Sequence, residues 1–203
     1  MQLANLHEKD QFNEPVWHVL LAIGAIIGLQ LAVSDTLTFG FMYIVVGLEI
    51  LLLLTLAVRL LPASVKRLAA IALISFISIA NIISLAIVIY ALFEGGHVNG
   101  RQLLLSGVAI FLTNIIVFGL GYWEMDNTRR SVNDFQFPQS ARDKTWKPTF
   151  FDYLYISITN AVAFSPTDTM PLTHRAKFLM TVQSVASLVT VALVAARAVN
   201  ILS

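Results

Sequence analysis

The sequence contains no cysteine, which excludes disulfide bonds, thiolate metal ligands and a cysteine nucleophile. Charge is also scarce: Asp, Glu, Lys and Arg make up 12% of the 203 residues, whereas an ordinary soluble domain carries about 25%. Hydrophobic residues make up 57% and are gathered in long runs. Because a soluble fold of this size needs charge to cover its surface, the composition indicates an integral membrane protein.

Signatures of catalysis are absent as well. The sequence has no GxSxG, HExxH, Walker or GxGxxG motif. Its four histidines stand at positions 7, 18, 97 and 174, without the spacing of a metal site. A net charge of +1 gives no reason to expect a nucleic-acid partner. We therefore expect a protein that is not an enzyme and holds no metal or cofactor.

Five apolar segments are long enough to cross about 30 Å of hydrocarbon at 1.5 Å per residue. They cover residues 15–33, 39–61, 68–93, 102–123 and 176–202. A shorter apolar stretch, residues 150–164, ends at Ser165-Pro166 and is too short to cross, which is typical of a re-entrant or interfacial helix.

The chain is predicted to be one all-α membrane domain, residues 1–203. Residues 1–123 hold four transmembrane helices, and residues 124–148 form a polar, exposed loop. Residues 149–203 hold a short re-entrant helix, its loop and the fifth transmembrane helix.

Three strongly polar side chains stand inside the predicted spans: Glu49, Asn81 and Asn114. A carboxylate at membrane depth costs about 2.5–3.5 kcal/mol on insertion scales, so Glu49 should face protein or water. These residues indicate either an intramembrane carrier or proton-coupled site, or a hydrogen-bond network between helices. The first span also contains the GxxxG pair Gly24 and Gly28, which permits close packing within the chain or between copies.

The C-terminal third follows the order short helix, tight loop, polar turn and full helix, and it resembles the pore domain of the potassium-channel superfamily. The residues that match in order and spacing are Asp168, Pro171, Thr173 and the pair Ala176-Lys177. Ser157 matches a small polar residue of the pore helix. The resemblance implies a homo-oligomer, a tetramer if the likeness is literal, with the fourth span as the outer helix.

The filter loop departs from that family. Its positions are Ala163, Phe164, Ser165, Pro166 and Thr167, followed by Asp168. A potassium filter coordinates ions with successive carbonyls on a glycine-rich backbone. This loop has no glycine, and Pro166 fixes its own φ and lacks an N–H. We expect weak or no potassium selectivity, with oxygen atoms of Thr167 and Asp168 at the mouth.

The last span carries small polar residues that could line such a pore. These candidates are Gln183, Ser184, Ser187 and Thr190. The alternative is that they let helices pack closely.

The expected function is therefore a channel-like membrane protein that passes monovalent cations through the lipid bilayer. A small-solute or proton-coupled carrier and a non-conducting partner subunit remain as alternatives. The chain is also similar to uncharacterised bacterial membrane proteins, which implies the bacterial inner membrane.

Positive charge gives an expectation for orientation. With five spans, Lys66, Arg67 and the segment 124–177 fall on one side, while Arg101 and Arg197 fall on the other. The positive-inside rule places the N-terminus and the re-entrant loop in the cytoplasm. The channel resemblance implies the opposite, with the filter outside.

Overall fold

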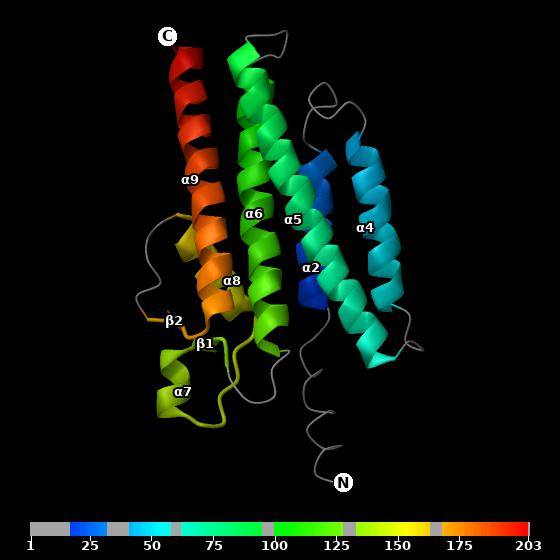
Figure 1. The fold of residues 1–203 in the computed structure, drawn as a ribbon, viewed down its shortest axis with the longest axis vertical. Coiled ribbons are helices and arrows are strands. Elements are labelled where there is room, and N and C mark those ends of the chain that lie inside the picture. Colours follow the sequence, from blue (N-terminus) through cyan, green and yellow to red (C-terminus); the bar gives the residue numbers. More distant parts are fainter. Residues whose placement is uncertain are drawn as a thin grey trace.

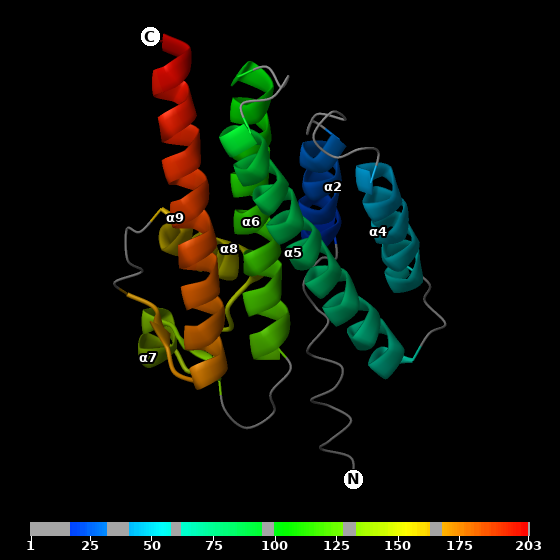
Figure 2. The ribbon, with the colours of Figure 1, turned by 45° about the horizontal axis from the view of Figure 1, so that its top comes forward.

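The computed structural model describes residues 17–31, 41–57, 62–94, 100–127, 133–162 and 168–202. Most of them belong to α2 (Trp17–Leu31), α4 (Phe41–Ala57), α5 (Ala63–Glu94), α6 (Gly100–Asn127) and α9 (His174–Leu202). Successive members of this set run in opposite directions, and α6 lies between α5 and α9 (Figure 1). Figure 2 shows the same order from a second side, with α4 at the far edge from α9. The central helix α6 contacts α2, α5, α8 and α9.

Three of these helices, α5, α6 and α9, are long and apolar enough to cross a membrane. The prediction of a mostly helical chain is confirmed, and these three helices could cross a membrane by their length and composition. The helices α2 and α4 are also apolar but have only 15 and 17 residues. A perpendicular span needs about 20 residues.

Helix ends reach beyond the apolar segments in both directions. α5 begins at Ala63 rather than at residue 68, and its first turn is closed by bonds from Val65 N and Lys66 N to the Pro62 carbonyl. α6 continues to Asn127, four residues past the predicted end at 123. Backbone hydrogen bonding continues into polar sequence, so apolar character marks the hydrocarbon-facing part of a helix and not its ends.

The main apolar core surrounds α6. It joins α2, α5, α8 and α9 through buried side chains that include Ile26, Ile77, Val117, Ile156 and Met180. At Gly119 of α6 the neighbouring helix comes so close that an added Cβ would lie 3.2 Å from Leu154 Cα. A glycine is required there because it lets α8 approach the backbone of α6.

The polar segment after α6, predicted as an exposed loop, contains a strand and a short helix in its described part. Residues 133–149, here called the cap, contain the strand β1 (Phe135–Gln136) and the short helix α7 (Pro138–Arg142). β1 pairs antiparallel with β2 (Met170–Pro171), with Phe135 opposite Pro171. The fold therefore includes a small two-stranded sheet that the all-α prediction lacked.

Aromatic side chains attach the cap to the helices. Phe135 is buried and stacks edge-on against Tyr122 of α6, with ring centroids 5.3 Å apart. Phe137 is also buried and lies 5.4 Å from both Trp146 and Tyr153, measured between ring centroids. Hydrophobic side chains at alternate positions of a polar segment thus anchor it to the end of the bundle.

Candidate functional site

The short helix α8 (Phe150–Ala161) packs against both α6 and α9 and starts at the cap end of the bundle (Figure 1). Its first residue packs edge-on against Trp123, near the end of α6. Two turns later, Ser157 donates its hydroxyl to the backbone carbonyl of Ile115, at 2.6 Å. Trp123 and Ile115 are eight residues apart along α6, which corresponds to a depth of about 12 Å at 1.5 Å per residue.

A capping box starts α8. The backbone N–H and the hydroxyl of Thr149 both donate to Asp152 Oδ2, at 2.7 and 2.8 Å. A carboxylate in the first turn also suits the positive end of the helix dipole. The helix beginning is therefore specified locally, whereas its depth is set by contacts with α6 and α9.

A buried polar cluster holds the inner end of α8. Gln183 of α9 is fully buried and donates its amide to Ser157 Oγ and to the Ser157 carbonyl, at 2.6 and 3.0 Å. Its Oε1 accepts hydrogen bonds from Tyr122 at 2.6 Å and from Asn160 at 2.8 Å. Ser184 completes the cluster by donating to Asn160 Oδ1 at 2.9 Å. Polar groups from three helices, α6, α8 and α9, thereby satisfy one another.

The four candidate pore-lining residues of α9 therefore face their own chain. Gln183 and Ser187 are fully buried, Thr190 is 1% exposed, and Ser184 is half-buried. Ser187 accepts a hydrogen bond from Asn114 of α6 at 2.8 Å, and Thr190 donates to the Ala186 carbonyl of its own helix. Of the two interpretations left by the sequence, this geometry favours the packing role over a wall of an open pore.

The opposite face of α9 is apolar and exposed. Its exposed side chains include Phe178, Val185, Leu188, Val191 and Val199. Such a face suits lipid or another apolar helix.

The predicted filter positions 163–167 lie outside the described residues. Asp168 follows them directly and is exposed. The chain then enters β2, which pairs with β1 of the cap. The segment from α8 to β2 therefore starts and ends at the same end of the bundle.

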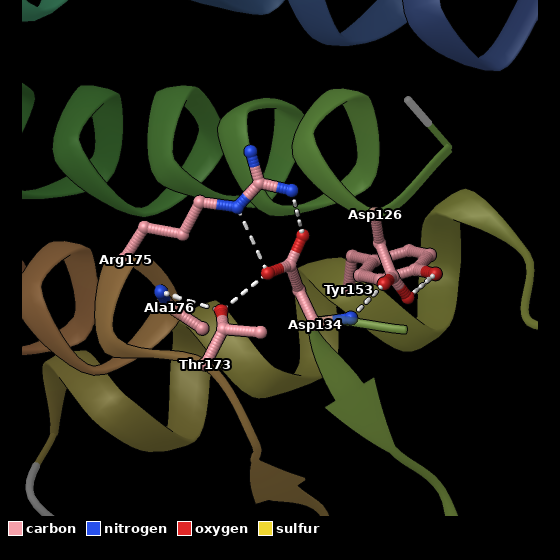
Figure 3. A network of polar contacts seen from close by, with 6 residues as sticks. All are labelled: Asp126, Asp134, Tyr153, Thr173, Arg175 and Ala176. Atoms are coloured by element: carbon pink, nitrogen blue, oxygen red, sulfur yellow. Dashed lines mark hydrogen bonds and ion pairs between the residues drawn. The ribbon is translucent and has the colours of Figure 1, made fainter. Parts of the chain in front are cut away.

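Asp134 of the cap is a hub that the sequence did not reveal. Its side chain is fully buried and takes two parallel hydrogen bonds from Arg175, Nε to Oδ1 at 3.0 Å and Nη2 to Oδ2 at 2.8 Å (Figure 3). Thr173 Oγ1 also donates to Asp134 Oδ1, and the Leu172 N–H donates to its carbonyl at 2.8 Å. A bidentate Arg–carboxylate pair fixes orientation as well as distance, so the start of α9 is locked to the cap.

A second carboxylate, Asp126 at the end of α6, extends this network. Its Oδ1 accepts the Asp134 N–H at 2.5 Å and its Oδ2 accepts the Tyr153 hydroxyl at 2.6 Å (Figure 3). The cap thus joins α6, α8 and α9 through side-chain oxygens.

At the exposed rim of the cap, hydrogen bonds from the Thr145 hydroxyl and N–H lower the pKa of Asp143 from its usual value.

The three intramembrane polar residues do not meet in one site. Glu49 is fully buried and accepts a hydrogen bond from Gln30 of α2 at 2.7 Å. Asn81 donates to the Ile110 carbonyl at 3.3 Å, and Asn114 donates to Ser187. Each residue is thus bonded to a different partner on a different helix pair.

The GxxxG pair also lies apart from any helix contact. A Cβ built at Gly24 or at Gly28 meets nothing within 4 Å. Close packing of this pair within the described part of the chain is therefore excluded.

The sequence does not show which side chains form the polar contacts of Glu49, Gln183 and Asp134. Gln30 and Asn160 were not singled out, although both are polar groups inside apolar runs. Asp134 was treated as one of several loop charges, and only its burial distinguishes it. Within the described residues, no group of three or more His, Asp or Glu side chains could hold a metal ion.

Compared with known proteins, the chain matches no family model, no curated protein and no solved structure. Support for a function therefore comes from the contacts and burial of the chain's own side chains.

Proposed function

We propose that this chain is the subunit of an oligomeric, channel-like membrane protein that conducts monovalent cations with weak or no potassium preference. The observation that carries the proposal is the excursion between α6 and α9. A short helix enters from the cap end and is held by Gln183 at its inner end, and the chain then returns to the cap. Helix, loop and helix in this arrangement match the order of pore helix, filter and inner helix that the sequence resembles.

The depth of α8 supports a re-entrant position. Its contacts with α6 run from Trp123 to Ile115, about 12 Å along the helix axis, which is less than half of a 30 Å hydrocarbon layer.

In this proposal the polar face of α9 fixes the short helix, and the conduction path lies elsewhere. Cations pass beside Asp168, whose exposed carboxylate attracts them, while the exposed apolar face of α9 contacts lipid or another copy of the chain. A ring of acidic side chains selects cations over anions without discriminating strongly among them. The absence of glycine from residues 163–167 argues against a standard potassium filter.

We further propose that all five long helices span the membrane. The helices α2, α4, α5, α6 and α9 alternate in direction, as a five-span chain requires (Figure 1). The 15 residues of α2 extend about 23 Å, so short flanking segments are needed to complete its span. In this arrangement the protein lies in a bacterial inner membrane.

Positive charge orients this arrangement. Lys66 and Arg67 stand at the start of α5, at the same end of the bundle as the cap. The cap itself exposes Arg142, Lys144 and Lys147. The positive-inside rule therefore places the cap in the cytoplasm, opposite to the orientation of potassium channels.

A carrier is supported less well. That alternative needs Glu49, Asn81 and Asn114 around one substrate, and each is bonded to a separate partner. A non-conducting partner subunit is the remaining alternative, and a flux measurement separates it from a channel.

The test is ion flux into liposomes that contain the purified protein, with potassium, sodium and chloride offered separately. We expect cation flux with little preference between potassium and sodium, reduced severalfold by Asp168→Asn. Asp143→Asn is the matched control, because it removes an exposed acid of the cap that the proposal does not use. Chloride flux, or equal flux from all three proteins, contradicts the acidic mouth. No flux from correctly assembled protein indicates a partner subunit.

A further inference from the structure

A buried acid–amide pair joins α2 and α4, away from the α6–α8–α9 unit. Glu49 is fully buried and Gln30 is 5% exposed. The Gln30 Nε2 donates to Glu49 Oε1 at 2.7 Å. This bond accounts for one oxygen of the carboxyl group and for the nitrogen of the amide.

The two other oxygen atoms of the pair are left without a donor. Glu49 Oε2 and Gln30 Oε1 are both buried and accept no hydrogen bond. An unsatisfied buried polar atom costs about 1–3 kcal/mol, and more if it carries charge. Both orphaned acceptors belong to the same hydrogen-bonded pair, which indicates that a donor is missing from this site.

Among the described residues, no charged side chain pairs with Glu49. His18, the titratable residue of α2, is twelve residues from Gln30, about 18 Å along the axis. α4 carries no other charged residue, and its Tyr43 is six residues from Glu49, about 9 Å away along the helix. The charges of α5 are Lys66, Arg67 and Glu94, at its two ends. Apolar residues Leu73 and Ile77 fill the buried middle of α5.

We propose that Glu49 and Gln30 form an intramembrane proton-binding site. One proton on Glu49 Oε2 makes this atom a donor to Gln30 Oε1, while Gln30 Nε2 donates to Glu49 Oε1. The pair then forms a closed ring of two hydrogen bonds, and uptake of the proton changes the charge of the site from −1 to zero. This inference does not rest on the proposed channel function, since α8 and Asp168 take no part in it.

A proton fits the site better than a metal cation. Hard cations take about six oxygen ligands. The described part of the chain supplies two unpaired oxygen atoms here, Glu49 Oε2 and Gln30 Oε1. A single proton satisfies both atoms at once, because a carboxylic acid donates through one oxygen and accepts through the other.

The test is infrared spectroscopy of the full-length protein in liposomes at pH 7. An ordinary glutamate has a pKa of about 4.3 and is ionised at this pH. We expect a carbonyl band of a protonated carboxylic acid that disappears in Glu49→Gln, a variant that keeps a hydrogen-bonding side chain opposite Gln30. In Gln30→Leu the band should move to higher frequency, because the acid carbonyl loses its N–H donor. Ser78→Ala, which removes a hydroxyl bonded only within α5, should leave the band unchanged.

Labelling with a hydrophobic carbodiimide gives an independent measurement. The reagent reacts with a protonated carboxyl group by adding its O–H across one C=N bond, so no leaving group is needed. Modification of the peptide that contains Glu49 should be present at pH 7 and insensitive to sodium. The proposal is overturned if wild type and Glu49→Gln have the same infrared spectrum, or if sodium protects Glu49 from labelling. Protection by sodium would indicate a metal-cation site instead.

Discussion

Gln183 of α9 donates its side-chain amide to both the hydroxyl and the backbone carbonyl of Ser157 of α8, at 2.6 and 3.0 Å. This relationship sets how deep the short helix lies between the two long ones. Gln183, which the sequence suggested as a pore-lining residue, is therefore buried within one chain.

Replacing Gln183 by Leu should destabilise the protein by about 1–3 kcal/mol, because it leaves buried groups of Ser157, Tyr122 and Asn160 with fewer partners. Denaturant unfolding in detergent measures the change. Thr181→Ala is the control, since Thr181 is exposed and bonds only the Lys177 carbonyl of its own helix. Equal stability of the two variants would show that the cluster does not hold α8.

Gly119→Ala and Gly121→Ala form a matched pair on α6. A Cβ at Gly119 lies 3.2 Å from Leu154 Cα, a backbone atom, whereas a Cβ at Gly121 meets nothing closer than Ile74 Cγ2 at 3.7 Å. Overpacking typically lowers the free energy of unfolding by about 1–3 kcal/mol, whereas replacing Gly by Ala within a helix raises it by up to about 1 kcal/mol. The Gly119 variant should therefore be the less stable by about 1 kcal/mol or more in thermal unfolding. The opposite order would mean that α8 does not pack at Gly119.

The Asp134–Arg175 pair should show strong coupling in a double-mutant cycle of Asp134→Asn and Arg175→Leu. Loss of Arg175 leaves the fully buried carboxylate with Thr173 as its remaining donor among the described residues, and such a loss costs up to about 3–5 kcal/mol. The Arg175 side chain is 41% exposed, so water can hydrate part of the site once Arg175 is removed. We therefore expect the substitution to lower the stability by about 1–3 kcal/mol. Additive effects of the two substitutions would show that the pair does not join the cap to α9. Lys177→Ala, an exposed cation two residues on, should be close to neutral.

Orientation can be measured with single cysteines, because the chain has none of its own. Lys144→Cys places a thiol on the exposed cap, and Val199→Cys places one near the opposite end of the bundle. The positive-inside rule predicts that an impermeant thiol reagent added to intact cells labels Val199→Cys and reaches Lys144→Cys only after lysis. The reverse pattern would give the chain the orientation of potassium channels.

Composition and periodicity alone determined the class of this protein. Long runs of apolar residues with few charges are typical of membrane-spanning helices, because such residues make a poor water-soluble surface. The order of long helix, short helix and long helix at the C-terminal end was readable in the same way, since length sets whether a helix can span. The start of α8 is also a local feature, because Thr149 and Asp152 form a capping box within four residues.

Only the tertiary structure decided which polar side chains meet. Gln183 reaches Ser157 from 26 residues away, Asp134 reaches Arg175 from 41 and Gln30 reaches Glu49 from 19, so no local pattern pairs them. The cap sheet was hidden for the same reason: two strands of two residues each carry almost no periodic signal, and they form because Asp134, Phe135 and Pro171 are brought together by packing. Membrane helices expose similar apolar faces along their length, and the few buried polar groups then select among possible packings because each must find a partner.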